Sequence, residues 1–341
     1  MPRKAAVQLG HGSSRGLIAG HDIAKHPALS NLLLHALDTD IVSTTRRGYS
    51  SAVRSYVDFC SVREIADFPV TEQTLGAFML RKMTTVSPNS LPVYLAGIRR
   101  ESDSRGLLWN LEGSVTIRRV FRYIKRTFPS KQGSAKLAVS LDMLMTMLPL
   151  LPGWPDLGAL GHNDLLFASS SIIGVLGLLR GGEFTFRKDQ ARPLLRRCDI
   201  QPKVVHGKRA IIVAVRQPKN CWWQTELEVV IFQGPPGSPF CPCALYDALC
   251  ARSPGARPTC PAFQFQDGAP LTRKWLLERT VGLVTMAGIS MVDQFGNNMT
   301  IKLASFRAGG LRSSINAKNA EPILKLQGRW RSDAWKSYWM N

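Results

Sequence analysis

The sequence has few acidic side chains and lacks the motifs of several large enzyme classes. Its 341 residues include only 24 Asp and Glu against 44 Lys and Arg, a formal net charge of +20. It contains no Walker-type GxxxxGKS or GxxxxGKT loop, no GxGxxG after a predicted strand and no HExxH. These absences argue against nucleotide-binding and zinc-protease chemistry. Because no histidine follows His206, a histidine-based triad in the second half of the chain is also disfavoured.

Long apolar runs are missing as well. The longest run, Leu165 to Leu179, carries three serines and ends at Arg180, short of the roughly 18 to 20 apolar residues of a membrane span. The first residues contain no apolar stretch, so we do not expect secretion, although their lack of acids leaves an organellar transit peptide open. With 45% hydrophobic residues, the composition is that of a globular protein with a core and not of a disordered chain.

Cysteines are too few and too scattered to form a disulfide framework. There are seven, an odd number. The nearest approach to a metal signature is Cys241-Pro-Cys243 followed by Cys250 and Cys260, but zinc sites usually show paired knuckles, often with histidine. Buried free thiols are the commoner fate of such residues. We therefore expect neither a metal site nor a cofactor.

The surplus of positive charge is the most informative property of the composition. With a pI near 10.1, the chain attracts polyanions, of which nucleic acid is the usual one. A merely soluble basic protein, or one that binds acidic lipid, is the alternative that charge alone leaves open.

The organisation of the chain follows from its helix and linker signals. We expect a mobile N-terminal segment over residues 1–42, a small helical domain over 43–128, a linker over 129–135 and a second domain over 136–341. Four helices are predicted in the small domain, because capping residues precede apolar residues at helical spacing. They begin near Ser43, Thr71, Ser90 and Ser114.

The second domain is predicted to be mainly α with a small antiparallel β-sheet. Two segments rich in Val and Ile, 210–216 and 225–232, predict strands joined as a hairpin through 217–224. The last stretch, 304–339, predicts a helix that breaks at Gly309-Gly310 and continues as a further helix. Helices are also predicted over residues 141–151, 163–179, 244–251 and 271–287.

Polar groups interrupt apolar sequence of this domain at three places. An apolar helix ends at Arg180-Gly-Gly-Glu183, Lys219 lies on the hairpin turn, and Arg307 precedes a Gly-Gly pair. Near the end comes Gly-Arg-Trp330, with Tyr338 eight residues later. Taken singly, these are more often a structural ion pair, a solvated lysine and packed aromatic residues.

In combination, this order of residues resembles the tyrosine recombinase, or phage-integrase, family. The ending GRWRSDAWKSY is most similar to the eukaryotic mobile-element branch of that family, the Crypton-type and related retrotransposon recombinases. The resemblance covers about residues 43–341, since the helix beginning TTRRGY is similar to the family's N-terminal core-binding domain. It implies a catalytic domain preceded by a small helical domain that clamps DNA.

The resemblance also implies a role for each residue. Arg180 and Arg307 match the two catalytic arginines, Lys219 the hairpin lysine, Trp330 the position held by His or Trp, and Tyr338 the nucleophile, while Glu183 matches the acidic companion of the first arginine. Two guanidiniums can each give parallel donors to the oxygens of a phosphodiester, and their charge favours the phenolate of tyrosine. Chemistry of this kind needs neither a metal nor ATP.

One departure from the family pattern concerns the histidine three residues before the second arginine, which is Ala304 here. A methyl group can neither donate nor accept a hydrogen bond, so one active-site contact is missing. Three outcomes stay open: a slower enzyme, replacement by Lys302 or Ser305, or a protein that only binds DNA.

We therefore predict a DNA recombinase or integrase that breaks and rejoins duplex DNA through a 3′-phosphotyrosyl intermediate. A catalytically weakened or inactive DNA-binding protein on the same fold is the alternative, and a basic interaction scaffold without a DNA role is the third. Self-association on DNA as a dimer or tetramer is expected, in the nucleus for a eukaryotic mobile element and otherwise in the cytoplasm or nucleoid. The candidate phosphate contacts are Arg46, Arg47, Arg118, Arg119 and Arg122.

Overall fold

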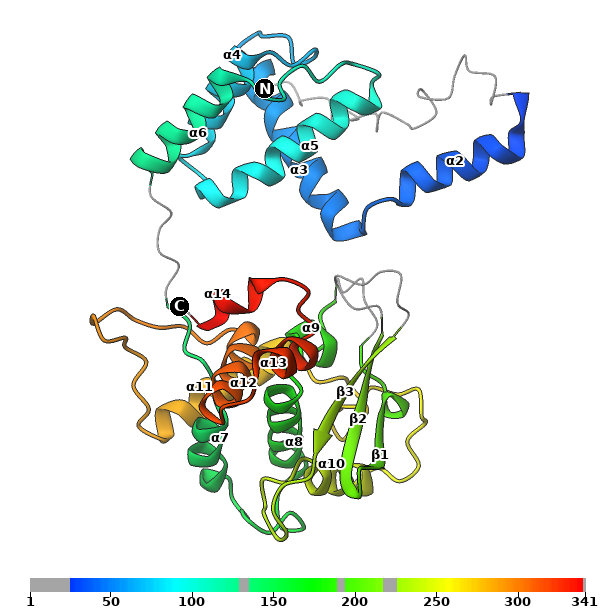
Figure 1. Ribbon diagram of the computed structural model, residues 1–341, viewed down its shortest axis with the longest axis vertical. Coiled ribbons are helices and arrows are strands. Elements are labelled where there is room, and N and C mark those ends of the chain that lie inside the picture. The colour runs from blue at the N-terminus through cyan, green and yellow to red at the C-terminus, as the bar shows by residue number, and fades with distance from the viewer. Residues whose placement is uncertain (1–24, 129–134, 189–193, 217–225, 340–341) are drawn as a thin grey trace, which may run out of the picture. The chain divides into compact units, whose positions relative to one another are not determined.

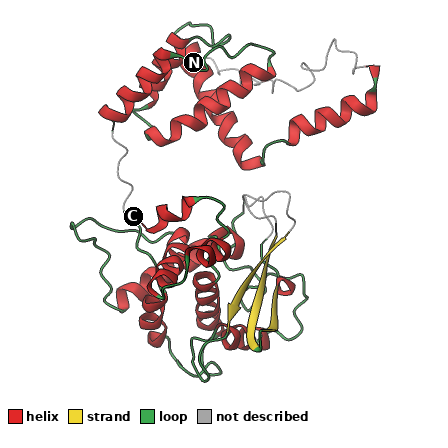
Figure 2. Ribbon diagram, viewed as in Figure 1, coloured by secondary structure: helices red, strands yellow, loops and turns green. Residues whose placement is uncertain are grey.

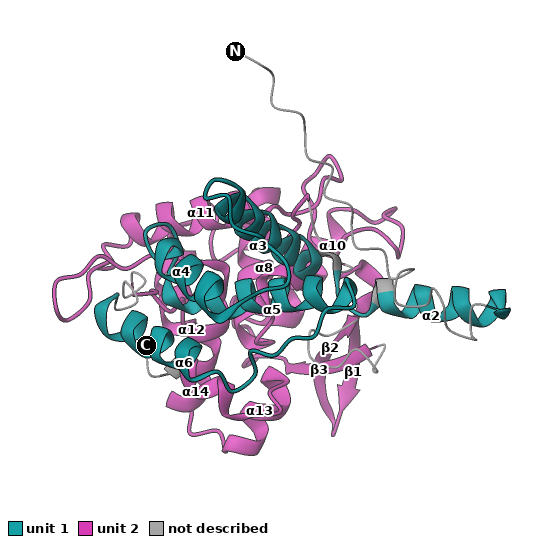
Figure 3. Cartoon of the chain, turned by 90° about the horizontal axis from the view of Figure 1, so that it is seen from above, with its two compact units in different colours: residues 1–133 teal, residues 134–341 magenta. Residues whose placement is uncertain are grey.

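The computed structural model describes residues 25–128, 135–188, 194–216 and 226–339 (Figure 1). The chain divides into two compact units, residues 1–133 and 134–341 (Figure 3). Each unit has a hydrophobic core of its own. We describe the two units separately.

Unit 1 is helical, and its main helices begin where the capping residues predict. The hydroxyl of Thr71 accepts a hydrogen bond from the Thr74 N–H, and that of Ser114 accepts one from the Ile117 N–H, which satisfies donors that a helix start leaves open. Tyr56, among others, is fully buried in the core. The helices are α3 (Ser43–Ser61), α4 (Glu72–Lys82), α5 (Leu91–Ser104) and α6 (Val115–Thr127), with a 3₁₀ turn at Pro88–Ser90.

A further helix, α2 (Pro27–Thr39), precedes these four. It lies within residues 1–42, and the expectation of a mobile segment there missed it. The guanidinium of Arg100 on α5 fixes the end of α2, since it pairs with Asp40 and donates to the Leu37 carbonyl at 3.0 Å. Pro27 at the first helical position is compatible with a helix start, because its missing N–H needs no partner there.

Unit 2 combines helices with one small sheet, as predicted (Figure 2). Its central helix, α8 (His162–Leu176), is buried from Leu165 to Val175, so the long apolar run of the sequence is a core helix. No helix among the described residues is long and apolar enough to cross a membrane. The other helices are α7 (Leu141–Met147), α9 (Gly181–Phe184), α10 (Pro242–Ala251), α11 (Arg273–Met286), α12 (Leu303–Asn316), α13 (Glu321–Gly328) and α14 (Lys336–Trp339), with 3₁₀ turns at Leu148–Leu150, Arg197–Asp199 and Asp333–Trp335.

The sheet has three antiparallel strands in the order β1-β2-β3, namely Ile200–Val205, Lys208–Arg216 and Glu226–Phe232. The predicted hairpin is present, since Arg216 pairs with Glu226 and Ala210 with Phe232. Strand β1 is not among the predicted elements, because it exposes four of its six residues and contains Pro202.

The predicted break at Gly309-Gly310 is wrong, because α12 runs through both glycines without interruption. A Cβ atom at Gly309 would lie 1.9 Å from the Val139 carbonyl oxygen, and one at Gly310 would lie 2.1 Å from that of Val175. The glycines therefore let α12 approach α8 and the segment before α7 more closely than side chains allow. This close approach sets the position of Arg307, two residues before the pair.

Candidate active site

The start of helix α9, which follows α8, brings Arg180 and Glu183 together. Arg180 directly precedes the short helix α9, and the carboxylate of Glu183 accepts two hydrogen bonds from Arg180. The Arg180 backbone N–H donates to Oε2 at 2.7 Å, and its Nη1 donates to Oε1 at 3.2 Å. The carboxylate thus fixes the backbone and the guanidinium of Arg180, whose side chain remains 22% exposed.

Helix α12 carries Arg307 into the same region. The residue is 2% exposed, yet its guanidinium is held by backbone carbonyls and not by an acid. Nη1 donates to the Leu178 carbonyl at 2.7 Å, and Nη2 donates to the Gly328 carbonyl. Its Nε atom is buried without a hydrogen-bond partner in the described part of the chain, an arrangement that costs about 1–3 kcal/mol when no partner arrives.

Two aromatic rings from the end of the chain cover Arg307. Its guanidinium carbon lies 4.3 Å from the ring centroid of Trp330 and 5.9 Å from that of Tyr338. The two rings lie 5.8 Å apart at 57°. Gly328 is required beneath them, because a Cβ atom there would lie 1.7 Å from the Trp330 ring. The structure thus brings the predicted residues Trp330 and Tyr338 onto Arg307.

A third arginine, Arg329, belongs to this cluster and is missing from the sequence-based set. Its Nη2 donates to Glu183 Oε2 at 2.8 Å and to the Leu178 carbonyl at 3.2 Å, and its side chain is only 3% exposed. The one signal in the sequence is its place between Gly328 and Trp330. Arg331, two residues on, is exposed, so residue type alone does not distinguish the two arginines.

The cluster carries an excess of buried positive charge. The guanidiniums of Arg180 and Arg329 both pair with the carboxylate of Glu183, and all three of these charges act on the nearby guanidinium of Arg307. Burial, followed by the charges of Arg180 and Arg329, lowers the pKa of Arg307, and Glu183 only partly offsets this. Arg307 is still a cation at neutral pH. Like charges held together out of water are unfavourable until an anion joins them, so the arrangement is suited to binding a phosphate group.

Ala304 lies in the first turn of α12, one turn before Arg307, and is partly buried. Of the two predicted replacements, Ser305 is already engaged within the helix, whereas the side chain of Lys302 is accessible. The Ser305 hydroxyl is fully buried and accepts a hydrogen bond from the Lys302 N–H at 3.0 Å. The Lys302 side chain is exposed at the N-terminus of the helix.

The predicted phosphate contacts lie on exposed positions of unit 1, and Lys219 lies outside the described residues. Arg46 and Arg47 are exposed on α3, and Arg118, Arg119 and Arg122 are exposed on α6. Arg118 also donates to the Gly113 carbonyl at 2.8 Å, which ties its side chain to the residue before the N-cap of its helix. A groove of about 630 Å³ runs along α6, lined by Leu80, Arg119, Val120, Arg122, Tyr123 and Arg126.

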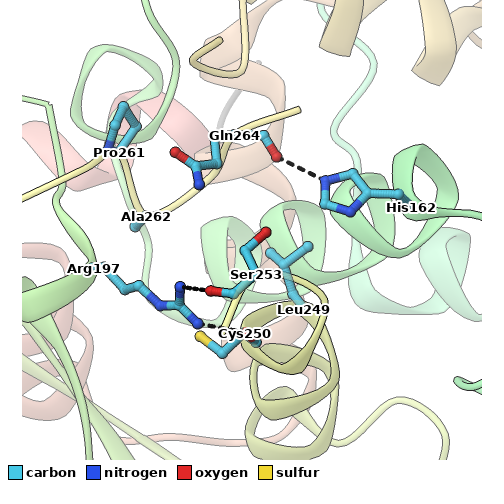
Figure 4. A pocket seen from close by; sticks show the side chains of 8 residues that line it. All are labelled: His162, Arg197, Leu249, Cys250, Ser253, Pro261, Ala262 and Gln264. Atoms are coloured by element: carbon cyan, nitrogen blue, oxygen red, sulfur yellow. Dashed lines mark hydrogen bonds between the residues drawn. The ribbon is translucent and has the colours of Figure 1, made fainter. Parts of the chain in front are cut away.

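A separate small cavity lies beside α10 and contains no ligand site (Figure 4). Its volume of about 10 Å³ is that of a single water molecule. Its main polar group, Arg197, is already bound to the carbonyls of Cys250 and Ser253, and His162 Nε2 lies 3.0 Å from the Gln264 carbonyl oxygen. Among the residues that the structure describes, no three side chains of His, Cys, Asp or Glu are grouped so as to hold a metal ion.

Tyr246 is the nearest alternative to Tyr338 as a nucleophile, and its surroundings do not suit that role. It is 3% exposed in the core of unit 2, and its hydroxyl donates to the Arg197 carbonyl at 3.4 Å. Burial raises the pKa of Tyr246 well above its ordinary value. A substrate would have no access to it.

No family model matches the sequence, and no curated protein matches it either. Solved structures do match the fold. A lambda integrase dimer bound to a COC′ core site superposes with a TM-score of 0.53 and 13% identity, covering 92% of this chain and 94% of that one. XerH site-specific recombinase in a post-cleavage complex with palindromic difH substrate superposes with a TM-score of 0.52 and 12% identity, covering 83% and 71%.

These neighbours are tyrosine recombinases, and at this identity the likeness concerns the fold alone. The chain therefore has the mainly helical fold with a small antiparallel sheet that such recombinases share.

Proposed function

We propose that the protein is a tyrosine recombinase that breaks and rejoins DNA. The observation that carries this proposal is the cluster of arginines beside Tyr338, in which Arg307 and Arg329 are buried. Arg307 lies 5.9 Å from the Tyr338 ring and is linked through Leu178 and Arg329 to the Glu183–Arg180 pair. A tyrosine beside a buried surplus of positive charge is the arrangement that attack on a phosphodiester requires.

In the proposed reaction, the phenol of Tyr338 gives its proton to water, a loss that the positive charge of the arginines favours, and the resulting phenolate oxygen attacks the phosphorus of one DNA strand. A bond forms between that oxygen and phosphorus while the bond to the 5′ oxygen breaks, and the departing oxygen takes up a proton. Arg180 and Arg307 stabilise the charge on the two non-bridging oxygens, and Lys219 supplies the proton. The 3′-phosphotyrosyl bond keeps the energy of the ester, so that a 5′-hydroxyl can attack it and restore the strand without ATP.

Duplex DNA is the proposed partner. The net charge of +20 supports it, as do the exposed arginines of α3 and α6, which would contact phosphates and so position the duplex without reading its sequence. Two of the structural neighbours are DNA complexes of lambda integrase, one of a dimer on a core site and one of a tetramer on a Holliday junction. We propose that this chain also assembles as a dimer or tetramer on DNA.

The Gly-Arg-Trp ending favours the Crypton-type, eukaryotic mobile-element branch of the family and with it a nuclear location. If the protein does not come from a eukaryotic mobile element, we propose that it is located in the cytoplasm or the nucleoid.

A weakened or inactive DNA-binding protein is the second candidate, and Ala304 favours it. Ser305 is engaged at the start of its own helix, so that of the two predicted replacements only the exposed Lys302 is left to fill the role. General acid–base groups contribute roughly 10²- to 10⁴-fold in rate, so the loss of one slows the chemistry without necessarily abolishing it.

Covalent capture tests the proposal without a known target site. The full chain is incubated with nicked duplexes of randomised sequence, from which the short fragment released by cleavage dissociates, and adducts that survive SDS are sequenced. We expect an adduct attached through Tyr338. Salt-sensitive DNA binding without any adduct would identify an inactive DNA-binding protein. If the protein did not bind DNA even at low salt, the remaining alternative would be a basic interaction scaffold without a DNA role.

A further inference from the structure

Arg329 has a backbone conformation that arginine rarely adopts. It follows the last residue of α13 with φ +56° and ψ +42°, in the left-handed region. Helices commonly end in this conformation with glycine, which lacks a Cβ atom, and the conformation is strained for a residue with a side chain. The glycine of this turn, Gly328, lies one position before the left-handed residue. The left-handed position itself is occupied by Arg329, which keeps a long side chain there despite the strain.

The side chain of Arg329 makes contacts that explain its retention. A single nitrogen, Nη2, donates both to Glu183 Oε2 at 2.8 Å and to the Leu178 carbonyl at 3.2 Å. Each acceptor also holds one of the two predicted catalytic arginines. Glu183 accepts from Arg180, and the Leu178 carbonyl accepts from Arg307 at 2.7 Å.

We propose that Arg329 is a positioning residue that sets Arg180 and Arg307 at a fixed separation, through Glu183 and the Leu178 carbonyl, so that both can grip one phosphate group. This inference rests on the proposed function and extends it to a residue outside the sequence-based set. Arg329 acts through its neighbours, since its side chain is only 3% exposed.

A purely structural role does not account for a third cation in this place. A buried ion pair is often no more stabilising than apolar residues of the same volume, and the charge of Arg329 adds to the repulsion that Arg307 experiences. That repulsion is relieved when an anion enters. The guanidinium thus both orders the site and favours its loading with a phosphate.

The test uses the full chain and duplexes recovered by covalent capture. Arg329→Asn removes the guanidinium while keeping a residue that tolerates the left-handed conformation. Arg329→Lys retains the positive charge and a single donor nitrogen. One nitrogen can make both hydrogen bonds, because in the wild type both come from Nη2. Arg331→Asn, at the exposed arginine two residues later, is the matched control. The rate of adduct formation is measured at saturating and at low DNA concentrations. In a separate measurement, thermal unfolding shows how far sodium tungstate, a tetrahedral dianion that mimics phosphate, raises the melting temperature of each variant.

We expect Arg329→Asn to slow adduct formation at saturating DNA by about 10²-fold, the usual effect of misplacing reacting groups by an ångström. DNA affinity should stay unchanged, Arg329→Lys should recover part of the rate, and Arg331→Asn should behave as the wild type. Since Arg329 acts in part through Glu183, adding Arg329→Asn to Glu183→Gln should cost less than Arg329→Asn costs in the wild type. Additive losses, or an Arg329→Asn variant with the wild-type rate, would overturn the inference.

The tungstate measurement separates this inference from the proposed function. If the wild type forms no adduct, the proposed function fails, and the role of Arg329 is decided by anion binding. Stabilisation of the wild type and of Arg331→Asn, but not of Arg329→Asn, would support an organising role for Arg329. Equal stabilisation of all three, or of none, would refute it.

Discussion

Arg307 donates a hydrogen bond through Nη1 to the carbonyl oxygen of Leu178 at 2.7 Å, across 129 residues of sequence. Leu178 lies just before Arg180, so the bond ties the helix of one arginine to the turn that carries the other. Because Leu178 is fully buried and belongs to a small hydrophobic cluster with Leu311 and Trp335, its carbonyl has little freedom to move. The relation between the two arginines is therefore built into the core of unit 2.

The first prediction concerns this bond. Arg307→Lys should lose most of the covalent adduct, by roughly 10²-fold or more, although the charge is kept. A lysine has one nitrogen and cannot reproduce a planar fork that donates to Leu178 and Gly328 while its remaining N–H groups face a phosphate. Rates of adduct formation with recovered duplexes measure the effect, with circular dichroism as the check on folding. An unchanged rate would mean that Arg307 acts only as a charge.

The nucleophile gives the second prediction. Tyr338→Phe should abolish the adduct while leaving non-covalent DNA affinity nearly unchanged, because one hydroxyl contributes little to a large electrostatic interface. The ring and its contact with Trp330 are retained in this variant, so the cover over Arg307 stays in place. Electrophoresis in SDS and a binding titration measure the two quantities. A Phe variant that still formed the adduct would show that Tyr338 is not the nucleophile.

The third prediction concerns the glycine pair of α12. Gly310→Ala should destabilise unit 2, because the new Cβ atom would lie 2.1 Å from the Val175 carbonyl oxygen and force α12 away from α8. Overpacking of this kind costs about 1–3 kcal/mol, which should appear as a lower midpoint of urea unfolding. Gly282→Ala is the matched control, since it lies within α11 with nothing near its Cβ position. It should instead stabilise by up to about 1 kcal/mol, and equal effects of the two changes would contradict the close approach.

A fourth prediction follows from Asp333, which joins the last two helices of the chain. Hydrogen bonds from Lys336 and Lys325 lower the pKa of this carboxyl to about 2. A lowered carboxyl pKa adds stability above its ordinary value near 3.8, and that stability is lost as the pH falls toward 2. We expect Asp333→Asn to lower the melting temperature slightly at pH 7, and the difference from the wild type to narrow between pH 5 and pH 3. Since the pairs are exposed, 1 M salt should also remove the difference.

Several features of the fold follow from local signals in the sequence. The helices that begin after Thr71 and Ser114 could be predicted because their hydroxyls satisfy the first N–H groups, which requires nothing beyond the local chain. Strand β1 could not, because its exposed residues carry no alternating apolar pattern and its place depends on pairing with β2. The glycine pair has low helix propensity, and packing against α8 overrides that preference.

Some residues of the candidate active site could also be predicted from the sequence, and others could not. The order of Arg180, Arg307, Trp330 and Tyr338 pointed to a set of residues, which the structure brings to one place in unit 2. Arg329 could not be distinguished from Arg331 because both are arginines near one aromatic residue. Only the left-handed turn at Arg329 directs its side chain inward. Tertiary geometry, and not residue type, decides which arginine is buried.

The last prediction concerns Ala304. It lies three residues before Arg307 in the same helix and so on the same face. If the missing histidine is the main weakness of the site, Ala304→His should raise the rate of adduct formation, at most by the roughly 10²- to 10⁴-fold that a positioned proton-transfer group supplies. The rate should then depend on pH near the imidazole pKa of about 6.5, which the wild type should not show.

Ala304→Gln is the control for Ala304→His, because it adds similar bulk without a group that titrates. A gain with histidine and none with glutamine would assign the effect to proton transfer or to a charged hydrogen bond. Equal gains would point to packing alone. Equal rates for all three residues would mean that another group, such as Lys302, already fills the role. A rate that fell with histidine while the protein stayed folded would refute the idea that position 304 faces the scissile phosphate.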